Sequence, residues 1–213
     1  MKRKTASFTG TRPIFTGSPS IVMGGFNLDK EKQNFAVGDV IPAGTPAIRD
    51  EVARKVQVIK TAKVSDVDAE DAKILTLYVD EFYAPFYAVG DKVLKADAIT
   101  GTFAAAPTIT KVEEKGSTYR ITLDKAIAGL AVGDVLVEVV EDAAKNAAER
   151  GKANSLTIKD TTVSEFETAM DVTADTMQYA LYERRVAPIP ASQKDETGCY
   201  LKANPHVKLT KSL

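Results

Sequence analysis

FAVGDVIPAG (35–44), YAVGDKVLKA (87–96) and LAVGDVLVEV (130–139) share one pattern: an apolar residue, the tetrapeptide Ala-Val-Gly-Asp, and a strand-like stretch. Glycine reaches backbone angles that other residues resist, and an aspartate carboxylate accepts hydrogen bonds from neighbouring backbone amides. Gly-Asp at this position therefore predicts a turn that leads into a strand, with a positive φ at the glycine. The copies are 52 and 43 residues apart, so the pattern is a recurring turn and not a strict repeat.

Between the second and third copies the sequence again has strand character. Two stretches with β-branched residues, 107–114 and 118–123, flank a short loop of Lys, Gly and Ser, which predicts a hairpin. KILTLYVD (73–80) and VLVEVV (135–140) add further strands. Because closing a sheet removes exposed edges, we predict that residues 64–140 form an inserted small β-barrel or sandwich unit.

The fold class predicted for the whole chain is mainly β, with small barrel or sandwich units, one or two short helices and extended arms at both ends. Residues 27–63 and 141–185 are expected to form the rest of a β-rich body. The alanine-rich stretch 141–154 predicts one short helix. Residues 162–185 stay open, because their apolar spacing fits a helix while YALYERRV (179–186) equally fits a closing strand.

Both ends of the chain are interrupted by proline and glycine, which exclude a continuous helix. We predict an extended arm at 1–26 and an extended tail at 186–213, each with isolated apolar side chains as anchors. The arm is expected to make little contact with its own body and to lie on a neighbouring subunit or a capsid surface. The candidate interface residues are Phe8, Pro13, Ile14, Phe15 and Ile21 in the arm, and Arg184, Arg185, Pro188 and Pro190 near the tail.

The composition of the 213 residues narrows the classes of partner. Lys plus Arg number 28 and Asp plus Glu number 29, a formal net charge of -1, so the chain lacks the positive field that nucleic-acid binders need. One cysteine, Cys199, excludes a disulfide within the chain and fits a reducing compartment. No apolar run approaches the roughly 18 residues of a membrane span, and no signal peptide is evident, so we expect production in the host cytoplasm.

The residues that usually carry catalysis or bind metals are few. Cys199 and His206 both lie in the predicted tail, away from the rigid support that catalytic groups need, and a zinc site needs about four N or S ligands. In the acidic stretch 66–71 a calcium loop would need Gly at its sixth position and a carboxylate at its twelfth, where Asp71 and Leu77 stand. Phosphate-binding glycine motifs do not occur in the sequence. We therefore expect no catalytic residue, no metal and no cofactor, and an enzyme that acts through distant carboxylates is a lesser alternative.

The stretch FAVGDVIPAGTPAIRD (35–50), with its Pro-Ala-Gly-Thr step at 42–45, resembles the entry strand of small head-decorating proteins of tailed phages. The layout of the chain, which ends its body with ERRVAPIP (183–190), resembles head-fibre and capsid-auxiliary proteins encoded by phages and prophages of gut bacteria. The resemblance implies a mainly β oligomer, with a trimer favoured, that binds the outer capsid surface through its termini. The unit at 64–140 is larger than minimal decorating proteins need.

These observations lead to two expectations of function. The first is a non-enzymatic virion structural protein that binds copies of itself and the major capsid protein on the capsid surface. The alternative is a carbohydrate- or host-surface-binding β module, in which the strands at 73–140 recognise the ligand. Neither function involves nucleic acid or a membrane.

Overall fold

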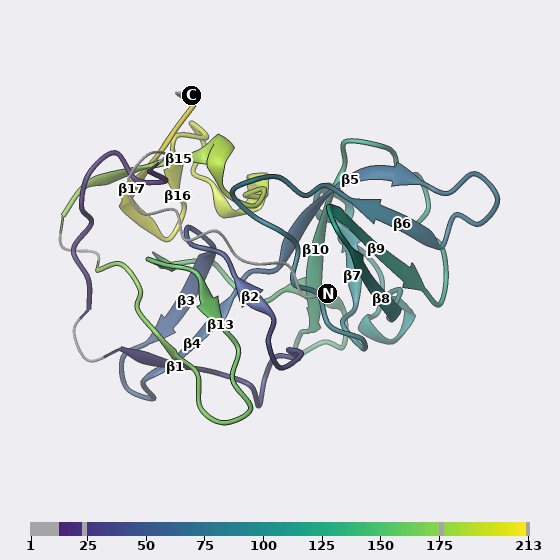
Figure 1. Ribbon diagram of the computed structural model, residues 1–213, viewed down its shortest axis with the longest axis horizontal. Coiled ribbons are helices and arrows are strands. Elements are labelled where there is room, and N and C mark those ends of the chain that lie inside the picture. The colour runs from purple at the N-terminus through teal and green to yellow at the C-terminus, as the bar shows by residue number, and fades with distance from the viewer. Residues whose placement is uncertain (1–12, 23–24, 175–176, 212–213) are drawn as a thin grey trace.

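The computed structural model describes residues 13–22, 25–174 and 177–211, and these are mainly β, as the sequence predicts (Figure 1). Their strands form four sheets. The helical segments of this described part are four turns of 3₁₀ helix, η1 (Ala96–Ala98), η2 (Phe103–Ala105), η3 (Glu183–Arg185) and η4 (Ala191–Gln193). None of the helices in it is long and apolar enough to cross a membrane.

The largest sheet has seven strands and forms the lobe on the right of Figure 1. Its strands run in the order β11 (Ala147–Glu149), β10 (Val135–Glu141), β5 (Thr61–Val67), β6 (Ile74–Leu77), β9 (Thr118–Leu123) and β8 (Ile109–Lys115), while β7 (Val93–Lys95) also pairs with β10. β8 and β9 are the predicted hairpin, and the sheet curls around a core that includes Leu75, Ile121 and Leu136. The sheet extends beyond 64–140 on both sides, since β5 begins at Thr61 and β11 ends at Glu149.

A second sheet of five strands lies on the left of Figure 1. Its order is β12 (Ser155–Leu156), β3 (Pro46–Asp50), β4 (Lys55–Val58), β1 (Phe26–Leu28) and β14 (Ala169–Met170), with β1 and β4 parallel. Beside it, β2 (Val40–Ile41) pairs with β13 (Thr161–Thr162). Phe26, Val56 and Met170 are buried in the core of this part of the molecule, so residues before and after the seven-stranded sheet fold together.

The third sheet shows that the described residues after 186 are part of the fold. β17 (Asn204–Thr210) lies between β15 (Tyr179–Tyr182), to which it is parallel, and β16 (Tyr200–Leu201). Val207 and Leu209 are buried, with exposures of 0% and 3%. The residues predicted as an extended tail with apolar anchors thus include strands of the third sheet, and side chains of β17 complete the core. The strand interpretation of 179–186 is confirmed for residues 179–182.

Residues 13–22 lie along the body of their own chain. The backbone N–H of Thr16 donates to the carbonyl of Ala180 at 2.9 Å, and the N–H of Tyr182 donates to the carbonyl of Ile14 at 2.8 Å. These bonds add the segment to the free edge of β15, where unpaired backbone groups would otherwise remain.

Phe15 shows why this segment belongs to the core. Its side chain is only 8% exposed, and its ring meets the ring of Tyr179 edge to face, with 6.0 Å between centroids. The expectation of little contact with the body is therefore wrong for residues 13–22, because the gain from burying Phe15 within its own chain outweighs leaving it for a partner. Residues 1–12, which include Phe8, lie outside the described residues.

The helix expected at 141–154 is also wrong. The stretch contains the turn between β10 and β11 and the whole of β11. The carboxylate of Asp142 accepts the backbone N–H of Ala144 at 2.8 Å and of Asn146 at 2.7 Å, and Lys145 takes a positive φ of 63°. Intrinsic helix preference is a weak effect, and here strand pairing and the aspartate turn prevail over it.

Candidate functional site

The three Ala-Val-Gly-Asp turns have the same geometry. Their glycines have φ values of +90°, +97° and +95° and each turn opens a strand, β2, β7 or β10, which confirms both predictions for this motif. Each turn forms two backbone hydrogen bonds with one residue of a neighbouring segment. The glycine N–H donates to the carbonyl of that residue, and the N–H of the same residue donates to the aspartate carbonyl. Val163 bonds in this way to Gly38 and Asp39, Ile109 to Gly90 and Asp91, and Val64 to Gly133 and Asp134, with N···O distances of 2.8 or 2.9 Å.

In each copy the aspartate side chain is hydrogen-bonded within the turn, whereas the valine side chain is exposed to solvent. The aspartate carboxylate accepts the backbone N–H of the alanine that begins the tetrapeptide, at 2.9, 2.9 and 2.8 Å. The valines are largely exposed, with 59% for Val37, 59% for Val89 and 65% for Val132. Each turn thus presents an apolar side chain to solvent on a backbone that is hydrogen-bonded from both sides. The repeated valine was the sequence signal for this feature, and the sequence reasoning did not use it.

The first and second turns line a common pocket of about 410 Å³. Its walls are residues 36–40 of the first turn and residues 84–89, which lead into the second turn. Val112 and Glu114, both on β8, complete the lining. Sequence reasoning did not find this pocket, because the two turns are 52 residues apart and meet only in the folded chain.

The pocket carries negative charge as well as apolar surface. The carboxylates of Asp39 and Glu114 both belong to its lining. Burial raises the pKa of the neighbouring Tyr119 above its ordinary value, and Glu114 and Asp39 raise it further. Both carboxylates therefore lie close enough to Tyr119 to disfavour its charged form.

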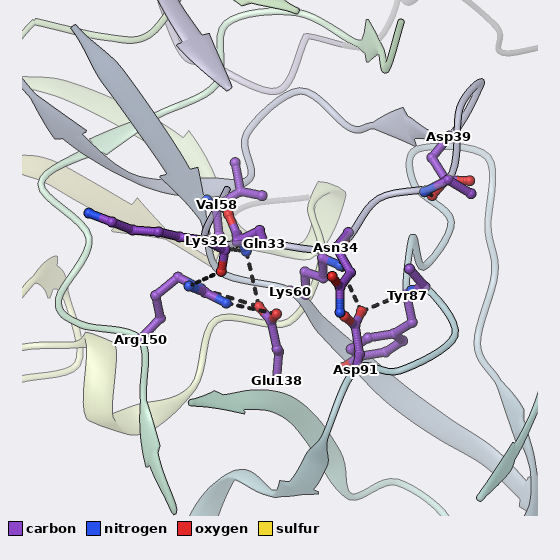
Figure 2. A network of polar contacts seen from close by, with 12 residues as sticks. Lys32, Gln33, Asn34, Asp39, Val58, Lys60, Tyr87, Asp91, Glu138 and Arg150 are labelled. Carbon is purple, nitrogen blue, oxygen red and sulfur yellow. Dashed lines mark hydrogen bonds and ion pairs between the residues drawn. The ribbon is translucent and has the colours of Figure 1, made fainter. Parts of the chain in front are cut away.

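A buried ion pair fixes the second turn (Figure 2). The Lys60 Nζ, between β4 and β5, lies 2.7 Å from Asp91 Oδ2, and the same oxygen accepts the N–H of Ala88 at 2.9 Å. Lys60 also donates to the carbonyl of Asn34 and lies 4.5 Å from the ring centroid of Phe35. One cation therefore ties the second turn to the segment that leads into the first turn.

A second buried group of polar side chains lies beside this pair, as Figure 2 shows. Arg150 Nη2 lies 2.8 Å from Glu138 Oε1, while Gln33 donates to Glu138 Oε2 at 3.0 Å and to the carbonyl of Val58 at 2.9 Å. The N–H of Val58 donates back to Gln33 at 2.8 Å. Gln33 thus joins β4 of the five-stranded sheet to β10 of the seven-stranded sheet.

Of the pair considered for catalysis, Cys199 directly precedes β16 and His206 lies in β17 of the third sheet. The carbonyl of Cys199 accepts the N–H of Leu209 at 2.7 Å, which places Leu209 opposite the cysteine. The N–H of His206 bonds to the side chain of Asn204 at 3.0 Å, and both His206 and Cys199 are exposed. The backbone of Cys199 is thus hydrogen-bonded to Leu209, and the backbone of His206 is hydrogen-bonded to Asn204.

The acidic stretch 66–71 contains the end of β5 and the first part of the turn that leads to β6. The carboxylate of Asp68 accepts the N–H groups of Glu70 and Asp71, at 3.0 and 3.1 Å, and these bonds hold the pKa of Asp68 below its ordinary value. Within the described ranges, no three His, Cys, Asp or Glu side chains are grouped so that they could hold a metal ion.

Of the candidate interface residues, the structure brings Pro13 and Arg185 together. Arg185 Nη1 donates to the carbonyl of Pro13 at 2.6 Å. The guanidinium lies 4.3 Å from the ring centroid of Tyr182 and 5.8 Å from that of Phe82. The other described candidates are placed as follows: Ile14 packs on the core, Phe15 and Pro190 are buried, Pro188 is half-buried, and Ile21 and Arg184 are exposed.

The described site offers apolar contact area, two carboxylates and walls held by buried polar bonds, which suits the binding of an apolar side chain flanked by basic groups. No family model, curated protein or solved structure matches this chain.

Proposed function

We propose that this chain is a non-enzymatic structural protein of a virion, of the capsid-decorating or head-fibre-like kind. The observation that carries the proposal is the exposure of large apolar side chains at the tips of turns, with Val52 at 96% and Phe166 at 83%. An apolar side chain that another protein covers contributes roughly 1.5–3 kcal/mol, so each of these side chains can contribute to binding a partner.

Val52 and Phe166 both belong to the five-stranded sheet. Val52 lies in the turn between β3 and β4, and Phe166 lies in the segment between β13 and β14. β4 and β14 are the two neighbours of β1, so one sheet carries both tips. A scaffold of short, densely hydrogen-bonded strands can hold such tips rigidly, which reduces the entropy that is lost when a partner binds.

A decorating protein needs to attach to a protein lattice and needs no chemistry of its own. The proposal therefore includes two partners: further copies of this chain, with a trimer favoured, and the major capsid protein at the outer capsid surface. The resemblance of FAVGDVIPAGTPAIRD (35–50) to the entry strand of head-decorating proteins supports the same proposal.

The experiment is co-sedimentation of the purified chain with empty capsids of the phage or prophage that encodes it, with the oligomer mass measured by light scattering. Val52→Ser and Phe166→Ser are each expected to weaken capsid binding about tenfold or more, which corresponds to about 1.4 kcal/mol. Val132→Ser is the matched control, because Val132 is also exposed, at 65%, but lies on the turn into β10. Glycan binding without any sedimentation with capsids would overturn the proposal in favour of a carbohydrate-binding module.

A further inference from the structure

The buried pair of Lys60 and Asp91 holds an amine directly against a carboxylate (Figure 2). Lys60 Nζ lies 2.7 Å from Asp91 Oδ2, and each side chain is 1% exposed. Because a C=O bond is about 1.2 Å long, Nζ is also within about 4 Å of the carboxyl carbon Cγ. Groups that react in a protein are held about 3–3.5 Å apart, so the amine is placed within reach of this carbon.

Burial distinguishes this pair from the other lysine–carboxylate pairs of the described residues. The next most buried pair, Lys194 with Glu183, has side-chain exposures of 20% and 17%. The ring centroid of Phe35 lies 4.5 Å from Lys60 Nζ, so an aromatic face replaces water on one side of the amine. Charges in such surroundings are costly, and a reaction that removes both of them is therefore favoured here far more than in water.

The hydrogen bonds around the pair leave one of its atoms without a partner. Asp91 Oδ2 accepts the N–H of Ala88 at 2.9 Å, and Lys60 Nζ donates to the carbonyl of Asn34. The other oxygen, Asp91 Oδ1, is buried and has no hydrogen-bond partner among the described residues. A buried polar atom without a partner is unfavourable, and in a folded protein it requires an explanation.

We propose that Lys60 and Asp91 condense to form an amide bond between their side chains, within one chain and without another enzyme. One proton passes from the ammonium to the carboxylate, which frees the electron pair of Nζ to form the bond to Cγ. The bond between Cγ and Oδ1 then breaks. Of the three ammonium protons, one stays on the amide nitrogen and two leave with Oδ1 as water, so the reaction needs no oxidant and no co-reactant.

The product matches the hydrogen-bonding groups that surround it. The amide oxygen is Oδ2, which keeps the N–H of Ala88 as its donor, and the amide N–H keeps the carbonyl of Asn34 as its acceptor. The two charges are removed, and the atom that leaves is Asp91 Oδ1, the one without a partner. The condensation thus accounts for the arrangement of donors and acceptors at this site.

The bond would fix the second Ala-Val-Gly-Asp turn to the connection between β4 and β5. It closes a covalent ring over residues 60–91, which restricts the unfolded chain as a disulfide would, but reducing agents do not open it. This inference does not depend on the proposed attachment to a capsid.

The test is mass spectrometry of the full chain. The intact, denatured protein should be lighter than its sequence by one water molecule. Trypsin does not cut after a lysine whose amine is acylated, so a tryptic digest should contain residues 56–63 joined to residues 74–92. Fragmentation of this branched peptide should place the link between Lys60 and Asp91.

Lys60→Arg and Asp91→Ala should each restore the full mass, because each removes one of the two reacting groups. Lys194→Arg is the matched control, since it changes the next most buried lysine of an ion pair and should leave the mass deficit intact. Thermal melts show whether each variant is folded. A deficit that persists in folded Lys60→Arg would overturn the proposal.

Two further results would also overturn it. The first is the full sequence mass both in freshly purified protein and after prolonged incubation of the folded chain. The second is a loss of water without the branched peptide, with normal cleavage after Lys60, because this pattern indicates a cyclic imide at an aspartate. Such an imide is opened by mild alkali, whereas the amide between the side chains is stable to it.

Discussion

Lys60 Nζ lies 2.7 Å from Asp91 Oδ2, and each of the two side chains is only 1% exposed. The lysine stands between β4 and β5, and the aspartate belongs to the second Ala-Val-Gly-Asp turn. The pair therefore joins the connection between β4 and β5 to the second turn, and the bond from Lys60 to the carbonyl of Asn34 adds the segment that leads into the first turn. Charges that are removed from water in this way are stable only as long as both partners are present.

Lys60→Met should lower the free energy of unfolding by about 3–5 kcal/mol, because it leaves the Asp91 carboxylate buried without its cation. Urea unfolding followed by circular dichroism measures the loss, and adding Asp91→Asn should restore part of it. Lys111→Met is the control, since the Lys111–Glu113 pair has side-chain exposures of 61% and 48% and should contribute less than about 1 kcal/mol. Equal losses for Lys60→Met and Lys111→Met would show that the buried pair does not stabilise the junction.

Gly133→Ala should lower the free energy of unfolding by about 1–2 kcal/mol through backbone strain alone. Gly133 has a φ of +95°, and the nearest atom to an added Cβ would be Lys63 Cε at 4.0 Å, so there is space for the methyl group. Gly133→Val should cost more, because a β-branched residue is more strained in this region. Gly17→Ala, where no atom lies within 4 Å and the φ is not in the left-handed region, should change stability by less than about 0.5 kcal/mol. A loss as small for Gly133→Ala would mean that the turn does not need glycine.

Phe15→Ala should lower the free energy of unfolding by about 3–5 kcal/mol, since it leaves a cavity where a buried ring stood. The variant that lacks residues 1–12 should still unfold cooperatively. The variant that lacks residues 1–26 should not, although it would if those residues were an arm separate from the body. Thermal melts of the three variants show whether residues 13–26 are part of the folded core or a separate arm. A stable, cooperative protein that lacks residues 1–26 would contradict the burial of Phe15 as a source of stability.

Asp134 and Asp160 should titrate on opposite sides of their ordinary pKa of 3.8. A hydrogen bond from Lys95, then one from the N–H of Ala131, lowers the pKa of Asp134. Its contribution to stability is therefore present above pH 3.8 and is lost as the pH falls through the folded pKa. Carboxyl-carbon NMR across pH 2–6 measures the folded pKa values of both groups.

For Asp160 the sign is reversed. Burial raises its pKa, and the hydrogen bond from the N–H of Ala43 only partly offsets this. The folded state thus holds the proton more tightly, and stability falls as the pH rises from 3.8 through the folded pKa. Asp160→Asn should remove this fall, while Asp134→Asn should remove the loss of stability at acid pH. The same slope for both variants would contradict the assigned causes.

The features that could be predicted from the sequence are local ones. The hairpin of β8 and β9 rests on β-branched residues around a short glycine-containing loop, and both strands are seen. The alanine-rich stretch 141–154 misled because its alanines favour a helix only weakly, while Asp142 and the edge of β10 offered competing hydrogen bonds. The pocket was missed because its walls come from parts of the chain with no shared sequence signal beyond the turn itself.

The sequence by itself determined the three turns, because everything that a turn requires lies within four residues: a glycine that adopts positive φ and an aspartate that accepts the N–H three residues before it. Only the tertiary structure decided which turns meet, that Lys60 would be buried against Asp91, and that Phe15 and Val207 would share one core. These contacts join residues that are tens to hundreds of positions apart. Their free energy depends on the water excluded when whole sheets pack together, and no local pattern records that quantity.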